Sequence, residues 1–560
     1  MPTIALIVTD TQRTRLGHPA RLGDVLGGVN VLTHTLRRAS GVAAVRRLVL
    51  VHPPGQAEAV RTLMGDARFD KPVHLFEAAA AEPGAQAHDA RWVAARRWAV
   101  TAWRGGLGGA TVYDELLPAA PLADAMRAHE ATSALLLRAE WCLFDPALAA
   151  SQLALHLEQP DAYKLSFTQA PPGLSGLVAH RDVIGRLVES GAAFGTGLGY
   201  QPRRPQGDPI TRELNRPVPP SVRDTYRRFV YDTPRSIDLL RTIADRLGDA
   251  LPTADAVAVT DAARAVEADD ADWPWRCLPQ QVTLELTPRR AVTGPITPHH
   301  HVAFDRPDLD VDLARRIIDQ LADPAAAGDV ALRLGGLGDA LLHPQWDAIV
   351  AAAQEAGVMS IGVDTDLLCD RATLDRLLAL PIDLLTVRLN ADTAATYRAV
   401  MGDDRFEQVA ENLQYLFDRR REALAAGRSP VKWIVPRLVK TAETLADMES
   451  FFQRWMMIEG HAVIEPAQSG GGLIPEQSPV PMAPPHRRPC RQMAGRMTIL
   501  SNGQVALCDQ DWQGQAALGE AQTATLLAIW QRMAGPAAQH AAGRFDALPL
   551  CARCSEWHRP

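Results

Sequence analysis

The chain has 560 residues, which is too many for one hydrophobic core, so several domains are expected. Its formal net charge of −7 gives no reason to expect nucleic-acid binding, which usually shows a basic excess. The sequence contains no uncharged apolar run as long as the ~20 residues of a membrane span. The first residues, MPTIALIVTD, lack the basic region and cleavage site of a secretory signal, and a cytoplasmic protein is expected.

Residues 1–250 alternate short apolar runs with helix-like patterns. Strands are predicted at residues 3–10, 47–53, 110–115 and 133–139, and helices at 29–40 and 89–103. Alternation of this kind predicts an α/β layered domain with a mainly parallel sheet. Residues 251–278 are rich in alanine and aspartate and are bounded by prolines, which indicates a linker that is in part helical.

Residues 279–485 have a regular strand–helix rhythm. Six strands are predicted, at residues 282–286, 329–336, 360–366, 384–391, 431–439 and 461–468. A helical segment fills each gap between them. Six β–α repeats predict a barrel or partial barrel, with its chemistry at the carboxyl ends of the strands.

The last part of the chain, residues 486–560, holds four of the seven cysteines. An odd number of cysteines in a large chain argues against a disulfide framework. Cys490 precedes a predicted hairpin, Cys508 ends its second strand, and Cys551 and Cys554 form a CxxC pair. Four thiolates suit either a [4Fe–4S] cluster or a tetrahedral zinc ion, and the spacing leaves both open.

This C-terminal stretch, from PCRQMAGRMTILSNGQVALCDQDW to LPLCARCSEWH, resembles the SPASM domain of many radical S-adenosylmethionine (SAM) proteins. The shared features are a cysteine, a hairpin with an SNGQV-like turn, a C-x-x-D segment, an IW helix and a terminal CxxC. The resemblance implies one auxiliary [4Fe–4S] cluster, held by Cys490, Cys508, Cys551 and Cys554. A small iron–sulfur domain at residues 486–560 is therefore expected.

The barrel region is similar to radical SAM barrels in three segments, residues 284–298, 334–346 and 384–413. The resemblance implies a vestigial SAM site at Gly335, Gly336, Gly338 and Asp339. The loop that should carry the family's CxxxCxxC motif has Arg290, Gly294 and Thr297 at the cysteine positions. Arginine offers no lone pair and glycine no side chain, so these residues cannot replace thiolates. SAM cleavage is therefore not expected, and SAM binding itself is in question.

Two further features of this region have alternative interpretations. Arg290 and Arg388 fall at the strand ends that face SAM in the family, where they would form an anion site or simply neutralise an abandoned one. His299, His300 and His301 are consecutive, and adjacent residues of an extended chain alternate sides. A solvated loop is therefore expected for them, with replacement metal binding as the alternative.

The N-terminal region resembles cytidylyltransferase-like, sugar-nucleotide-forming enzymes in the segment TQRTRLGHPARLGDVLGG. The resemblance implies that nucleotide phosphates would lie against Arg13, Arg15, Gly17 and Arg21, and that Asp114 and Asp232 would bind Mg²⁺ beside a nucleoside triphosphate. The family's two phosphate-neutralising lysines are missing. Asp232 in DTP also has a structural interpretation, as the N-cap of a helix that begins with proline.

The three regions together are similar to the proteins called spiro-SPASM, a name that describes an architecture. The leading hypothesis is an accessory or binding protein for glycan or peptide modification, without SAM cleavage, that holds one [4Fe–4S] cluster. A small-molecule or glycan ligand and a partner protein fit this hypothesis, and the sequence names no catalytic residue. The alternatives are a Mg²⁺-dependent nucleotidyltransferase that acts on a sugar or sugar phosphate, and a structural zinc protein.

Overall fold

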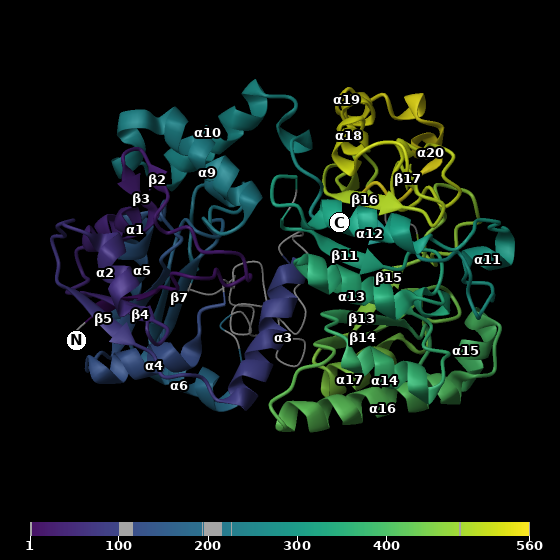
Figure 1. Cartoon of the computed structure of the whole chain (residues 1–560), viewed down its shortest axis with the longest axis horizontal. Coiled ribbons are helices and arrows are strands. Elements are labelled where there is room, and N and C mark those ends of the chain that lie inside the picture. The colour runs from purple at the N-terminus through teal and green to yellow at the C-terminus, as the bar shows by residue number, and fades with distance from the viewer. Residues whose placement is uncertain are drawn as a thin grey trace. The chain divides into compact units, whose positions relative to one another are not determined.

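The computed structural model describes residues 3–99, 116–192, 194, 215–225, 227–326, 328–480 and 483–558. The chain forms two compact units (Figure 1). The first unit comprises Met1–Ala85 and Gly109–Trp273, and the second comprises Gln86–Gly108 and Pro274–Pro560. Both units are mixed α/β structures built on largely parallel sheets. Among the described residues, no helix combines the length and apolarity needed to cross a membrane.

The first unit is built on a seven-stranded sheet with the order β5-β4-β1-β6-β8-β7-β9. Its strands are β1 (Thr3–Val8), β4 (Leu48–His52), β5 (Val73–Glu77), β6 (Ser133–Arg138), β7 (Leu165–Thr168), β8 (Leu177–His180) and β9 (Asn215–Arg216). A small hairpin joins β2 (Val25–Leu26) and β3 (Val29–Asn30). The first four main strands are parallel, whereas β8 runs antiparallel to β6. The strands predicted near residues 3, 47 and 133 are present, and the one predicted at 110–115 lies outside the described residues.

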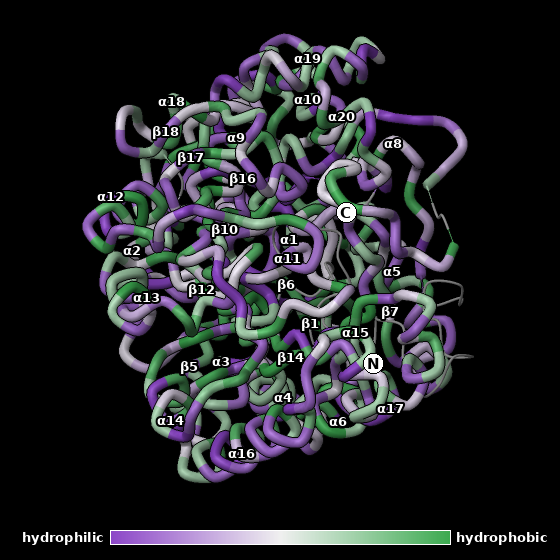
Figure 2. Tube along the Cα trace, turned by 90° about the vertical axis from the view of Figure 1, so that its right-hand side faces the viewer, coloured by the Kyte–Doolittle hydropathy of each residue, from purple (hydrophilic) through white to green (hydrophobic). Residues whose placement is uncertain are grey.

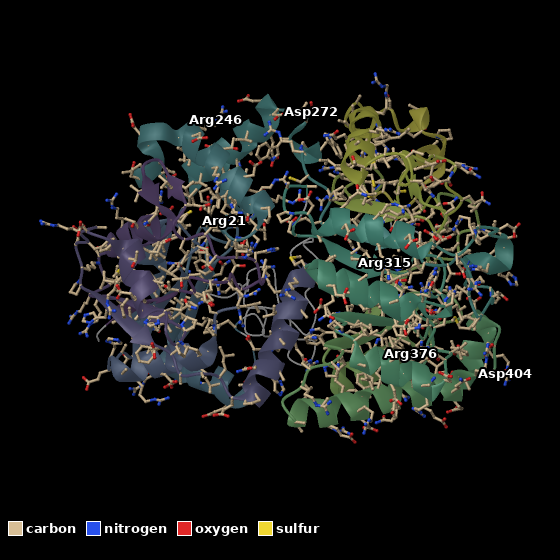
Figure 3. The ribbon with its side chains drawn as sticks, in the orientation of Figure 1. Arg21, Arg246, Asp272, Arg315, Arg376 and Asp404 are labelled. Carbon is tan, nitrogen blue, oxygen red and sulfur yellow. The ribbon has the colours of Figure 1, made fainter. Side chains whose placement is uncertain are left out.

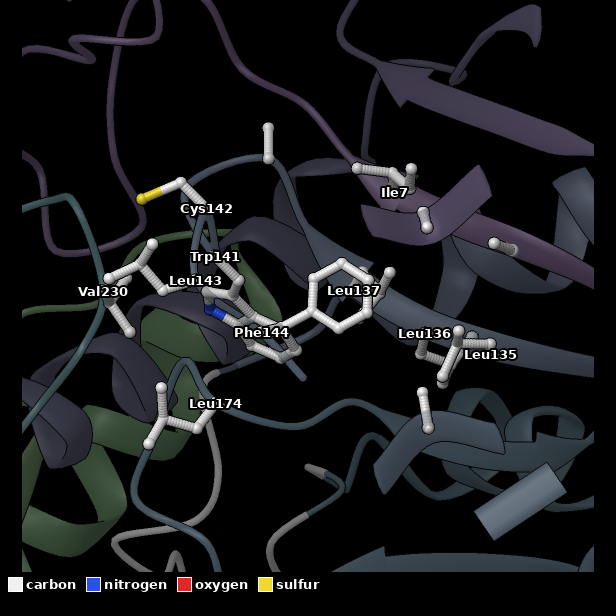
Figure 4. Packing of buried hydrophobic residues seen from close by; sticks show 14 of the residues in the cluster. Ile7, Leu135, Leu136, Leu137, Trp141, Cys142, Leu143, Phe144, Leu174 and Val230 are labelled. Atoms are coloured by element: carbon white, nitrogen blue, oxygen red, sulfur yellow. The ribbon is translucent and has the colours of Figure 1, made fainter. Parts of the chain in front are cut away.

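The helices of this unit are α1 (Val31–Ser40), α2 (Ala57–Met64), α4 (Ala119–Ala128), α5 (Pro146–Glu158), α6 (Arg181–Ser190), α8 (Pro220–Arg223), α9 (Pro234–Leu247) and α10 (Ala256–Asp269). Helix α1 begins where the Asn30 side chain accepts a hydrogen bond from the amide of Thr33. The core packs Trp141, Leu143 and Phe144 beside residues of β6 (Figure 4). Helix α10 falls in the segment predicted as a linker, and its apolar face belongs to this core.

The second unit contains a nine-stranded sheet with the order β15-β14-β13-β12-β11-β10-β16-β17-β18. Its first six strands, consecutive in the sequence and parallel, are β10 (Gln281–Leu284), β11 (Ala331–Leu334), β12 (Ser360–Thr365), β13 (Leu384–Arg388), β14 (Trp433–Lys440) and β15 (Val463–Pro466). This arrangement confirms the predicted six-strand β–α rhythm. Apolar residues of these strands, such as Val363 of β12 and Leu385 of β13, belong to the core between the sheet and the helices.

The helices of the barrel region are α11 (Pro298–His301), α12 (Val311–Ala322), α13 (Trp346–Ala356), α14 (Arg371–Ala379), α15 (Ala394–Met401), α16 (Phe406–Ala425) and α17 (Met448–Ile458). Along α16, hydrophilic and hydrophobic residues alternate in the trace (Figure 2). Its buried residues include Val409, Leu413 and Leu416, at the spacing of one helix face. All of these helices except α11 contribute buried residues to the core on one side of the sheet, and residues on its other side line the barrel interior.

The predicted C-terminal hairpin continues the barrel sheet. Strands β16 (Arg496–Ile499) and β17 (Gln504–Ala506) are antiparallel, followed by β18 (Gly519–Glu520). Gly503 has a φ of +84° in the turn, a conformation that favours glycine. Strand β16 pairs in parallel with β10, so it covers the open edge of the barrel sheet. The helices that follow are α18 (Leu526–Gln531), α19 (Ala534–Ala541) and α20 (Pro549–Arg553).

Helix α3 (Pro83–Ala99) lies in the region predicted as N-terminal, yet from Gln86 it belongs to the second unit. The indole of Trp433 donates to the carbonyl of Arg91 at 2.7 Å, and the Arg91 guanidinium lies 4.3 Å from the Trp433 ring centre. The ring of Trp98 faces Gly362 of β12, where a Cβ atom would lie 2.7 Å from it. Helix α3 is therefore a structural part of the barrel.

Candidate functional site

The four C-terminal cysteines meet at one place. Cys490 precedes a short 3₁₀ turn, Cys508 follows β17, Cys551 lies in α20 and Cys554 caps that helix. All four line a single cavity of about 20 Å³. The hairpin and the terminal helix thus bring together residues that are far apart in the sequence, as the resemblance implied.

Backbone amides point at three of the four sulfur atoms. The Cys490 thiol interacts with the amides of Gln492 and Met493, and the Cys508 thiol with that of Gln510. The amide of Glu556 donates to Cys554 Sγ at 3.2 Å. Hydrogen bonds of this kind stabilise thiolates and tune iron–sulfur clusters.

A cation adjoins the cysteines, and the sequence analysis did not single it out. Arg487 lines the same cavity and donates from Nη2 to the carbonyl of Cys551 at 2.5 Å. Its guanidinium lies 4.5 Å from the ring centre of Phe545, which holds it in place. Its charge lowers the pKa of three of the thiols, although burial dominates and raises the pKa of Cys551 to about 12. The signal in the sequence was the basic run HRRPC.

The two metal interpretations require different arrangements of the four thiols. Zinc holds its sulfur ligands about 2.3 Å from one ion, so the thiols must converge on a point. Within the described part of the chain, no three His, Cys, Asp or Glu side chains converge in this way. A [4Fe–4S] cluster instead spaces four thiolates around a larger core. Four thiols that line one cavity are the ligand set that such a cluster uses.

The loop without cysteines is packed by its own residues. Arg290 donates to both carboxylate oxygens of Asp366, at 3.0 Å from Nε, and both side chains are buried. Gly294 lies against the backbone of α15, where a Cβ atom would approach the Met401 carbonyl carbon to 2.0 Å. The Thr297 hydroxyl donates to the carbonyl of Gly294 at 2.8 Å. Each of the three residues at the positions that resemble the cysteine motif therefore has a role in packing the loop.

The glycine segment that resembles a SAM site is packed by groups of the chain in the same way. Gly336 has a φ of +101°, and Arg388 donates to the carbonyls of Gly336 and Gly338 at 2.8 and 2.9 Å. At Gly338, a Cβ atom would lie 1.8 Å from the carbonyl oxygen of Thr287. At Gly335, it would lie 2.6 Å from the Asp364 side chain. The chain's own groups thus contact the positions that resemble a SAM site.

Asp339, at the glutamate position of the family motif, is buried and bonded within the chain. Its carboxylate accepts from the amides of Leu341 and Asp366, at 3.0 and 2.9 Å, and from the hydroxyl of Thr365 at 3.1 Å. Burial, with the nearby Asp366 charge, raises the pKa of Asp339 to about 6. The residue joins the loops after β11 and β12.

The three histidines do not face one ion. His299, His300 and His301 each lie near a different backbone carbonyl, those of Pro288, Thr293 and Pro295, at 2.5, 3.2 and 3.0 Å. They form the short helix α11 rather than an extended segment. Their rings thus contact the backbone of the loop that precedes them.

In the first unit, the predicted phosphate-binding residues lie on the loop after β1. Arg13 donates to the carbonyl of Gly17 at 3.2 Å, and Gly17 has a φ of +99°. Arg15 donates to the carbonyl of Leu116 at 3.1 Å. Arg21 is exposed (Figure 3). Two of the three arginines thus hold the backbone in place.

The predicted magnesium ligands cannot be compared as a pair, because Asp114 lies outside the described residues. Asp232 is buried and accepts two hydrogen bonds from Arg228, one of them at 2.6 Å. It precedes the N-cap of α9, which is Thr233 rather than Asp232 as the structural interpretation supposed. Nearby Glu140 is paired with Arg138 at 3.0 Å. Asp232 is therefore neutralised within the chain.

Comparison with known proteins adds a match for the C-terminal part. Residues 490–555 match SPASM, an iron–sulfur cluster-binding domain. An uncharacterized protein of Treponema pallidum (strain Nichols) is 28% identical over 123 residues, which are 22% of this chain. The match spans 34% of that relative's own length, about a third.

Solved structures with related arrangements were also found. BtrN in complex with AdoMet and 2-DOIA has a TM-score of 0.32 and 13% identity, covering 50% of this chain and 93% of its own. Streptococcus suis SuiB bound to S-adenosylmethionine has a TM-score of 0.38 and 12% identity, covering 58% and 88%. A cytidylyltransferase from Leptospira borgpetersenii serovar Hardjo-bovis has a TM-score of 0.32 and 13% identity, covering 48% and 95%. The family match shows that residues 490–555 are similar to SPASM iron–sulfur cluster-binding domains.

Proposed function

We propose that this chain is an accessory or binding protein that holds one [4Fe–4S] cluster on Cys490, Cys508, Cys551 and Cys554 and does not cleave SAM. The observation that carries the proposal is the set of four thiols around one cavity, inside the segment that matches SPASM. Amides directed at three of the sulfurs support thiolate ligation. When bound, the cluster would supply one-electron redox chemistry or a rigid fold.

The barrel supports the second half of the proposal. The loop after β10 has no thiol at residues 290, 294 and 297. Arg290 and Asp366 neutralise each other's charge in a buried ion pair. Cys369 follows β12, and one thiol cannot hold a second cluster. Arg388 donates hydrogen bonds to the carbonyls of Gly336 and Gly338 in the glycine segment. These contacts favour a barrel that no longer performs the family's radical chemistry.

The setting that we propose is the modification of a glycan or a peptide, with a partner protein carrying out the reaction. This setting is drawn from the resemblance of the N-terminal region to cytidylyltransferases. We propose binding rather than turnover for that unit, because Asp232 is paired with Arg228 instead of being directed at a metal. The family's lysines are also missing from its phosphate-binding segment.

The test is the iron, sulfide and zinc content of the full chain after anaerobic purification. About four irons and four sulfides per chain are expected. The Cys551→Ala/Cys554→Ala variant should lose them, whereas Cys369→Ala, which removes a thiol outside the cavity, should keep them. Zinc without iron would contradict the cluster. About eight irons, or 5′-deoxyadenosine formed from SAM and a reductant, would contradict the proposal that the barrel holds no cluster and does not cleave SAM.

A further inference from the structure

The barrel interior contains a second cavity, of about 150 Å³. Side chains from β10, β11, β13, β14, β15 and β16 line it, together with residues that follow Cys508. Cavities of this size hold a molecule as large as benzene when their lining is apolar. This lining is polar and includes five arginines, at positions 290, 333, 388, 437 and 496. A lining of this kind suits a small, charged ligand.

Four of the five arginines have partners within the chain. Arg290 pairs with Asp366, and Arg388 donates to two carbonyls. Arg333 lies 2.6 Å from Asp364, and Arg437 lies 3.1 Å from Glu465. The chain satisfies the anion site predicted at residues 290 and 388 only in part, because among the described residues the buried Nη1 of Arg388 has no hydrogen-bond partner. Their guanidinium groups hold the cavity walls in place.

Arg496 differs from these four. It is half-buried and lines the cavity, and its guanidinium makes no hydrogen bond and no ion pair with the residues that the structure describes. Burial lowers the pKa of Arg496, because a desolvated cation is costly, and the charge of Asp509 opposes this effect without forming a contact pair. An arginine fork in such a place matches the two oxygens of a carboxylate or phosphate.

Polar neighbours surround this guanidinium. Gln281 is directly opposite Arg496 in the sheet register, and Thr283 is opposite Thr498 one layer further along the same two strands. These side chains line the cavity without hydrogen bonds to the described part of the chain. We call the set the Arg496 face; it consists of Gln281, Thr283, Arg496 and Thr498. It offers a guanidinium fork, an amide and two hydroxyls as donors.

The acidic residues that line the cavity differ in how far their charge is compensated by partners, and so in how strongly they would repel an anion. Glu285 accepts from Arg306 at 2.9 Å and from the amide of Ser501 at 3.2 Å. Asp511 accepts from the amides of Gln515 and Ala516 at 2.8 and 2.9 Å. Glu465 is paired with Arg437. Asp509 is left as the nearby negative charge, and it accepts from the amide side chain of Gln510 at 3.3 Å.

We propose that the Arg496 face binds the oxyanion group of a small molecule, a carboxylate or a phosphate. The proposal is independent of the cluster, since none of its residues is a cysteine ligand. It gives the barrel a binding role that does not require SAM. The ligand supplies the contact partner that Arg496 lacks among the described residues, and the remaining volume accommodates the rest of a molecule of a few heavy atoms.

The test uses the full chain, purified anaerobically, with inorganic phosphate, acetate and succinate as probes at constant ionic strength. Isothermal titration calorimetry should show saturable binding of phosphate or of a carboxylate, and the preferred probe identifies the group. Arg496→Gln should weaken it at least about tenfold, or about 1.4 kcal/mol. Thr498→Val should weaken it less. Arg315→Gln is the control, because Arg315 is 59% exposed on α12 (Figure 3).

A stability measurement separates binding from structure. If Arg496 serves a ligand, its removal relieves a half-buried cation that lacks a contact partner, so unliganded Arg496→Gln should unfold at the same or a higher urea concentration than the wild type. A lower midpoint would assign Arg496 a structural role and overturn the proposal. Absence of saturable binding of all three probes to the wild type, or equal binding by Arg496→Gln, would overturn it as well.

Discussion

The guanidinium of Arg290 and the carboxylate of Asp366 form a two-point ion pair inside the barrel, with both side chains almost fully buried. Arg290→Met would leave the carboxylate without its partner, at a cost of about 3–5 kcal/mol. Urea unfolding should show this loss, and Arg290→Met/Asp366→Leu should recover most of it. The adjacent pair of Arg289 and Asp308 is exposed, so Arg289→Met should cost less than about 1 kcal/mol. Equal losses in the two single variants would contradict the assignment.

Introducing the three cysteines of the CxxxCxxC motif should not produce SAM cleavage. In Arg290→Cys/Gly294→Cys/Thr297→Cys, the side chain at residue 294 would meet backbone atoms of α15 within 2.0–2.4 Å. The loop must therefore shift before three thiols can converge. Iron content should stay at about four per chain, with no 5′-deoxyadenosine formed from SAM. An increase to about eight irons would show that the loop is more adaptable than its packing indicates.

Asp339 should make stability depend on pH in the acidic range. Its pKa is raised by burial to about 6 in the folded chain, from an ordinary value of 3.8. Between these values the folded chain binds a proton that the unfolded chain releases, so the contribution is largest below about pH 4 and is lost as pH rises through 6. The urea midpoint of the wild type, relative to that of Asp339→Asn, should fall between pH 4 and 6. A difference that is flat or rises with pH would refute this.

Arg487 should raise the reduction potential of the proposed cluster. A guanidinium beside the thiols stabilises the more negative, reduced state. Arg487→Gln should lower the potential on the order of tens of millivolts, measured by a redox titration followed by electron paramagnetic resonance. The exposed neighbour, Arg488→Gln, is the matched control and should change it little. Equal shifts in the two variants would point to long-range charge alone.

The contact of Gly362 with Trp98 should be visible in a double-mutant cycle. Gly362→Ala places a methyl group 2.7 Å from the indole and should cost about 1–3 kcal/mol. Adding Trp98→Ala should remove the clash, so the two effects should not be additive in urea unfolding. Gly357→Ala is an instructive comparison, since a Cβ atom there meets nothing but the φ of +84° is strained. Additive effects at residues 362 and 98 would show that α3 does not pack there.

Periodicity predicted the barrel strands because each is a short apolar run between turn signals. Leu384–Arg388 and Ser360–Thr365 were found this way. It did not predict that β16 would join β10, since pairing between distant strands depends on an edge that no local pattern reveals. The same limit applies to α3, whose helical spacing was evident while its partner, Trp433, lay far along the chain.

The cysteine cavity was foreseeable because thiols at structured positions are rare and specific. The partners of Arg290 and Asp232 could not be predicted, because the sequence is the same whether an arginine or aspartate contacts a ligand or a neighbouring residue. The Arg496 face was missed for a related reason. Its members lie on two strands that are adjacent in the sheet and far apart in sequence, and none carries a motif.

Helix α3 has a consequence for the order in which the chain can fold. A growing chain makes α3 well before the barrel strands that receive it, and domains usually fold from the N-terminal end during synthesis. Trp92 and Trp98 must therefore remain without their final partners while the first unit forms on both sides of them in the sequence. A fragment that ends before Pro274 would contain α3 without Trp433 and Gly362, the barrel residues that contact it.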